Sequence, residues 1–170
     1  MFPLLTLNNK EIMSKKNINH FAIKNNILSK IARQINEGGV TYGPLLDKNY
    51  GGTPNIAISP FPERSKIFKG KATERMVTNY FNRNNDLFQK GFAIGGWSDK
   101  SSNKTYLDIT APIPLEKQSE AIKLGKKANQ IAGFNLSDFS EVPLGGTGEF
   151  SSLVSPYYER LEDAEMLMNN

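Results

Sequence analysis

The chain has 170 residues, of which 38% are hydrophobic and 22% charged, and its formal net charge is +4. This length and composition predict one folded domain with a sizeable core and exclude a chain that is disordered throughout. The absence of cysteine excludes disulfides, thiolate nucleophiles and cysteine-bound zinc, and a single histidine, His20, excludes a site built from several histidines. We therefore expect no metal and no cofactor.

Charge is distributed unevenly along the chain. Between Lys10 and Arg33 there are six lysine and arginine residues against one acid, whereas between Leu136 and Asn170 there are seven acids against one arginine. Such segments can contact each other, contact another chain, or lie in solvent without a partner. No apolar run reaches the length of about 18 residues that a membrane span requires. We expect no membrane partner.

The first predicted element is a basic helix over residues 17–37. Apolar side chains recur there at helical spacing: Ile27, Leu28, Ile31 and Ile35. Residues 1–16 are expected to be a flexible leader, with neither the basic start nor the cleavage site of a secretory signal. Met13 is an alternative translation start to Met1.

Residues 38–137 predict an α+β core in the order β-β-α-β-β-α-β. The expected strands and helices are strands at 40–46 and 55–59, a helix at 71–87, a hairpin with arms at 92–97 and 105–110, a helix at 115–131 and a strand at 132–136. We expect one small mixed or antiparallel sheet with two helices packed on it. Residues 138–170 predict a largely extended, loop-rich acidic tail with a short helix at 157–168.

The predicted hairpin contains the only tryptophan and an acid within an apolar run. Strand alternation places Leu107 and Ile109 on one face and Tyr106 and Asp108 on the other. This pattern is typical of a half-buried strand, and it favours a scaffold in which Asp108 faces solvent or a neighbouring strand. The alternative is a shallow site lined by Trp97, Tyr106 and Asp108.

Four stretches together carry a resemblance: GGVTYGP, NIAISPFPERSKI, IGGWSD followed by KTYLDIT, and EAIKLGKKANQIAGFNL. Over residues 38–137 they resemble an uncharacterised domain of phage and prophage proteins. The matching positions are Gly38, Gly39, Thr41, Ser59, Pro60, Glu63, Arg64, Gly95, Gly96, Trp97, Tyr106, Leu107, Asp108, Asn129, Gln130 and Ala132. The resemblance implies a protein carried in a virion or present in the host cytoplasm. It implies no activity.

Three further groups are candidate binding residues. Arg64 follows a rigid proline-rich turn and could contact an anion. Asn129 and Gln130 could bond the backbone of the Gly95–Trp97 arm or contact a ligand. Nucleic acid could bind the basic N-terminal helix through Lys15, Lys16, Lys24, Lys30 and Arg33.

These observations favour a phage-encoded accessory or structural protein that acts by protein–protein contact in the virion or its assembly. Its partners would be other virion proteins or a second copy of the chain. The alternatives are a small phage enzyme or toxin with a site around Arg64, Trp97, Tyr106 and Asp108, and a nucleic-acid-binding accessory that uses the basic helix. An enzymatic role is not favoured.

Overall fold

The computed structural model describes residues 25–169. The expected leader and the first part of the basic helix, with Lys15, Lys16, Lys24 and His20, lie outside the described residues. Within them the fold is α+β, as expected. The helices are α2 (Asn25–Glu37), α3 (Glu74–Arg83), α4 (Asn85–Phe88), α5 (Gln118–Lys127) and α6 (Tyr157–Met168), and short 3-10 turns are η1 (Pro62–Arg64) and η2 (Leu115–Lys117). The strands are β1 (Gly39–Gly43), β2 (Lys48–Asn49), β3 (Asn55–Ile58), β4 (Lys66–Lys69), β5 (Ala93–Asp99), β6 (Lys104–Pro114), β7 (Ala132–Asn135) and β8 (Ser140–Pro143).

The eight strands form one antiparallel sheet, which is larger than the small sheet expected from the sequence. Along the sheet the order is β2-β1-β5-β6-β3-β7-β8, and β4 also pairs with β6. The long strand β6 has β5 on one side and two short strands on the other. Ile58 of β3 lies opposite Ala111, and Lys66 of β4 lies opposite Leu107. The chain between those two strands, which includes η1, therefore leaves the sheet beside the middle of β6.

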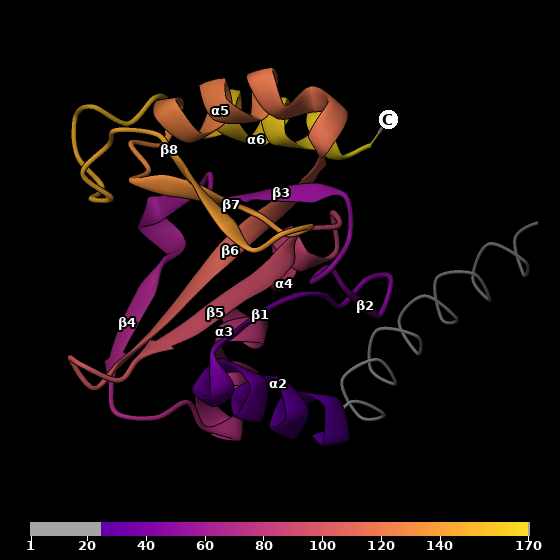
Figure 1. Ribbon diagram of the computed structural model, residues 1–170, viewed down its shortest axis with the longest axis vertical. Coiled ribbons are helices and arrows are strands. Elements are labelled where there is room, and N and C mark those ends of the chain that lie inside the picture. Colours follow the sequence, from indigo (N-terminus) through magenta and orange to yellow (C-terminus); the bar gives the residue numbers. More distant parts are fainter. Residues whose placement is uncertain (1–24, 170) are drawn as a thin grey trace, which may run out of the picture.

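All the described helices contribute to the side of the sheet that carries the main core. Alternate residues of β6 point into this core and are at most 1% exposed: Leu107, Ile109, Ala111 and Ile113. The pair α5–α6 and the pair α2–α3 lie toward opposite ends of the sheet (Figure 1). The alternation inferred for this strand is confirmed, because Leu107 and Ile109 are buried while Tyr106 and Asp108 share the opposite face.

The opposite face of the sheet has only a small apolar cover of its own. Tyr50, Ala93 and Leu136 form a minor core there, with Ala57 packed against it. This minor core lies over one part of β5 and β3. Among residues 25–169, no helix covers the remainder of the face near the β5–β6 turn, and this remainder carries the candidate site.

The short helix expected at 157–168 is confirmed as α6 (Tyr157–Met168), but the tail is not an extended arm. β8 pairs with β7, and α6 packs into the main core, where Ala164 is 0% exposed and Arg160 is 1% exposed. The sequence signal for a loop holds only for residues 144–156, which contain no helix or strand. In the described part of the chain, none of the helices combines the length and the apolar character that crossing a membrane requires.

Candidate functional site

The candidate site is a row of four residues across neighbouring strands on the uncovered face. Gly39 lies opposite Trp97, Trp97 lies opposite Tyr106, and Tyr106 lies opposite Ile67. We call these four residues the aromatic face. They come from β1, β5, β6 and β4, so the rigid sheet fixes their spacing.

Trp97 and Tyr106 stack on each other across the two central strands. Their ring centroids are 4.5 Å apart and the ring planes differ by 7°. Trp97 remains 46% exposed and Ile67 is 62% exposed. The neighbour of Trp97 on β1 is Gly39, which contributes no side chain beside the outer surface of the indole ring. The stack therefore presents a flat aromatic surface to solvent.

Asp108 lies in the next row of the same face, opposite Gly95. A Cβ atom at Gly95 would collide with the carboxylate of Asp108 and with the hydroxyl of Thr110. The glycine is therefore needed to make room for these polar groups. Thr110 Oγ1 donates a hydrogen bond of 2.7 Å to Asp108 Oδ1.

Desolvation raises the pKa of Asp108 above its ordinary value, and hydrogen bonds from the hydroxyls of Thr110 and Ser59 act in the opposite direction. No lysine or arginine forms an ion pair with this carboxylate in residues 25–169. The side chain of Asp108 is half-buried and lies over Gly95 of β5. Of the two positions expected from the sequence, it therefore faces a neighbouring strand and not solvent alone.

Gln130 supports this polar group from a distance. Its Oε1 accepts a hydrogen bond of 3.0 Å from the backbone N–H of Ser59, and its Nε2 donates one of 2.7 Å to the carbonyl of Ala132. Gln130 therefore positions the residue whose hydroxyl reaches Asp108. The expected bonds to the Gly95–Trp97 arm do not form.

Asn129 binds the loop that follows β8 and does not contact the polar group around Asp108. It follows α5 in the left-handed conformation, with φ of 54°. Its side-chain amide donates to Thr147 Oγ1 at 2.6 Å and to the carbonyl of Glu149 at 3.2 Å. Asn129 thus holds the glycine-rich loop after β8 and does not reach the aromatic face.

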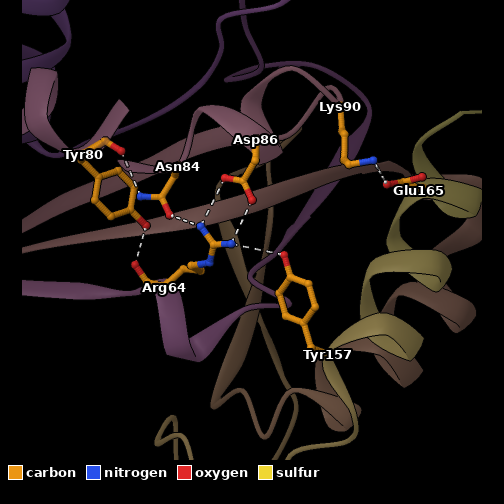
Figure 2. Close-up of polar contacts among 7 residues, drawn as sticks. All are labelled: Arg64, Tyr80, Asn84, Asp86, Lys90, Tyr157 and Glu165. Carbon is orange, nitrogen blue, oxygen red and sulfur yellow. Dashed lines mark hydrogen bonds and ion pairs between the residues drawn. The ribbon is translucent and has the colours of Figure 1, made fainter. Parts of the chain in front are cut away.

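Arg64 belongs to a separate cluster that joins η1 to α4 and α6 (Figure 2). Its guanidinium donates to Asp86 Oδ2 at 2.9 Å, to Asn84 Oδ1 at 3.0 Å and to the hydroxyl of Tyr157 at 3.5 Å. Burial alone would lower the pKa of Arg64, but the hydrogen bonds and charge of Asp86 raise it. Its donors are thus directed at groups of the protein, which argues against the anion-contact hypothesis.

Glu63, the residue before Arg64 in η1, is also held by hydrogen bonds, in this case from α6. Glu63 accepts hydrogen bonds from the buried Arg160 at 2.7 and 3.0 Å, and Arg160 also donates to the carbonyls of Pro60 and Ser155. Glu63 and Arg64 therefore do not pair with each other. Each of them fastens η1 to a helix, and Arg160 is a structural residue that sequence reasoning missed.

Four exposed lysines surround the end of the sheet beyond the aromatic face: Lys69, Lys71, Lys100 and Lys104. We call this group the lysine end. None of the four forms an ion pair with a residue of the described chain. Lys69 and Lys104 lie directly opposite each other on paired strands. Like charges in this arrangement repel, so an anion placed here would be stabilised.

A cavity of about 330 Å³ opens at the lysine end. It is lined by Asn36, Gly70, Lys71, Ser98, Asp99, Lys100, Asn103 and Lys104. The one acid among these residues, Asp99, already accepts hydrogen bonds from Ser101 Oγ at 2.6 Å and Ser102 Oγ at 2.7 Å. These bonds lower the pKa of Asp99 to about 2.

The structure brings together three of the predicted site residues, Trp97, Tyr106 and Asp108, and separates Arg64, Asn129 and Gln130 from the aromatic face. Lys30 and Arg33 are exposed on α2, and Arg33 lies 3.9 Å from Glu37. Sequence reasoning missed Ile67 and the lysine end. The segment KIFK of β4 was the available signal, since two exposed lysines flank two apolar residues there.

The arrangement offers little for acid–base or metal chemistry. A raised pKa is what a general acid at neutral pH requires, but hydroxyl groups are the hydrogen-bond partners of Asp108. Residues 25–169 hold no group of three or more acids and histidines placed to bind a metal ion. The geometry favours binding over catalysis.

Comparison with known proteins gives no family for the chain. A scan against protein-family models found no match, and searches of curated proteins and of solved structures found none. The resemblance to a phage domain stays a prediction.

Proposed function

We propose that the protein is a binding module, an accessory or structural component of a phage particle or of its assembly, and that the aromatic face is its contact surface. The observation that carries this proposal is the Trp97–Tyr106 stack, which stands exposed between Gly39 and a 62% exposed Ile67. Exposed apolar side chains that gather on one face mark interaction sites more often than singly scattered ones.

The same face is built in the manner of a recognition surface. All four of its residues lie on paired strands, so they keep their positions without a partner and lose little conformational freedom when one binds. Tryptophan and tyrosine contribute large contact areas at low entropic cost. The phage setting is supported only by the resemblance of residues 38–137 and is part of the proposal.

The proposal can be tested by site-specific photo-crosslinking in the cells that naturally express the gene. A diazirine amino acid replaces Ile67, which leaves the aromatic stack intact, and in a control chain it replaces Tyr158, which is 80% exposed on α6. Diazirines insert into C–H and O–H bonds, so they capture proteins and nucleic acids alike.

We expect a discrete adduct from position 67 and none of comparable yield from position 158. A Trp97→Ala substitution in the same chain should abolish the adduct if the stack forms part of the contact. Equal yields at the two positions, or no adduct at position 67 at any stage of expression, would refute the aromatic face as a contact surface.

A further inference from the structure

The geometry points to a single-stranded polynucleotide as the occupant of the aromatic face, with its bases on the Trp97–Tyr106 stack and its phosphates at the lysine end. This inference rests on the proposed function, because it names the ligand of the same surface. It places nucleic-acid binding on the sheet and not on the basic N-terminal helix where the sequence suggested it.

The aromatic face fits an unpaired base. Proteins that bind single strands stack successive bases on aromatic rings, and an uncovered antiparallel sheet is a common platform for such rings. Trp97 already has Tyr106 against one ring surface, at 4.5 Å and nearly parallel. The other ring surface faces β1, where the paired residue is Gly39 and has no side chain. Bases inside a duplex are stacked on each other and could not use this surface.

The lysine end lies at the correct distance for the backbone of the same ligand. In the sheet register, Lys104 is two residues from Tyr106, and Lys69 is two residues from Ile67. Two residues of a β-strand span about 7 Å. Lys71 and Lys100 line the cavity of about 330 Å³, which reaches Ser98 and Asn36 on the helix side of the sheet. Phosphates beside the stacked base would therefore meet the positive charges of Lys69 and Lys104 first.

The composition of this surface favours nucleic acid over a protein partner. Protein interfaces are enriched in aromatic residues but depleted in lysine, whereas nucleic-acid sites combine aromatic rings with lysine. Asp99 is the one acid that lines the cavity, and it is occupied by Ser101 and Ser102. Asp99 keeps its negative charge, but the four lysines outnumber it, so the end of the sheet carries a net positive charge.

The binding experiment uses the full chain and labelled oligothymidine and oligouridine of about 20 nucleotides, longer than the sites of typical single-strand-binding folds. A matched duplex and polyglutamate are the competitors. Trp97 is the only tryptophan, so its fluorescence reports directly on the aromatic face. We expect a single strand to quench this fluorescence and to bind more tightly than the duplex, while polyglutamate neither quenches it nor competes.

Two test variants, each with a matched control, separate stacking from charge. Trp97→Ala should weaken binding about 5- to 150-fold, the range measured for loss of one stacked base, whereas Tyr158→Ala, which removes an exposed ring from α6, should not. The double change Lys100→Gln and Lys104→Gln should reduce the slope of log K against log salt by about 1.4, if each lysine meets one phosphate. Lys123→Gln with Lys126→Gln removes the same charge from exposed positions of α5 and should leave the slope unchanged. Unchanged unfolding curves will show that the variants are folded.

Two results of the binding experiment would overturn the inference. One is the absence of binding to either oligonucleotide at low salt. The other is binding that the Trp97 and Lys100–Lys104 variants weaken no more than their controls do. The chemical nature of the adduct from position 67 separates this inference from the proposed function. A nuclease-sensitive adduct supports a polynucleotide, whereas a polypeptide adduct overturns this inference and leaves the proposed contact surface standing.

Discussion

The two faces of the β5–β6 hairpin use adjacent glycines for opposite purposes. On the helix side, a Cβ atom at Gly96 would lie 2.7 Å from Ile35 Cδ1 and 3.1 Å from Leu107 Cδ2, so the glycine lets α2 pack closely on the sheet. On the other side, Gly95 makes room for Asp108 and the hydroxyl of Thr110. One face of the hairpin is therefore apolar and covered, and the other is polar and aromatic and left open.

This difference shows where the fold gains stability and where it can bind. The helix side removes apolar surface from water, which contributes about 25 cal/mol for each Å² buried. The open side contains a half-buried carboxylate without an ion pair and a tryptophan that stays 46% exposed, so it removes less apolar surface from water. Residues that cost stability without supporting the core are common at functional sites.

The largest effect is expected on the helix side. Leu107→Ala should lower the free energy of unfolding by about 2–5 kcal/mol, because Leu107 is 1% exposed and its loss leaves a cavity. Denaturant unfolding monitored by circular dichroism would measure this loss. A change below about 1 kcal/mol would mean that the core collapses around the site and that the two faces differ less than the burial indicates.

Gly95→Ala tests the open side of the same hairpin and should cost about 1–3 kcal/mol, the usual range for overpacking. The new methyl group would collide with the carboxylate of Asp108 and the hydroxyl of Thr110. The cost should therefore shrink when Asp108→Ala is present as well, and a double-mutant cycle measures this coupling. Additive effects would show that Gly95 is needed for some reason other than room for Asp108.

The sequence predicted much of this hairpin because strand alternation is a local property. Leu107 and Ile109 on the one side, and Tyr106 and Asp108 on the other, follow from their order alone. What the sequence could not supply is the neighbour across each strand. That Gly95 lies beside Asp108, and Gly39 beside Trp97, depends on pairing between segments that are distant in the chain.

The tail and the arginines were misjudged for the same reason. The sequence predicted the helix at 157–168, but not the long-range contact between Arg160 and Glu63 that holds α6 against the core. The sequence around Arg64 does not indicate that Asp86 and Tyr157 both accept hydrogen bonds from its guanidinium (Figure 2). Burial of a charged side chain can be predicted only when the position of its oppositely charged partner is known.

The smallest and most specific effect concerns the ionisation of Asp108. Its pKa in the folded chain is raised by desolvation above the ordinary 3.8, so the folded state holds this proton at pH values where the unfolded chain has lost it. Stability contributed by the protonated form is therefore fully present below pH 3.8 and declines as the pH rises toward the raised pKa. The slope cannot exceed about 1.4 kcal/mol per pH unit for one group.

Asp108→Asn removes this ionisation while it keeps the size of the side chain. The difference in unfolding free energy between the variant and the original chain should shift in favour of the variant as the pH rises above 3.8, and should then become constant. Asp99 and Asp138, whose pKa values are lowered by hydrogen bonds from nearby serines, contribute equally to both proteins and cancel in the difference. A difference that does not vary with pH would show that Asp108 is as well solvated as in the unfolded chain, and the contrast between the two faces of the hairpin would then rest on the aromatic stack alone.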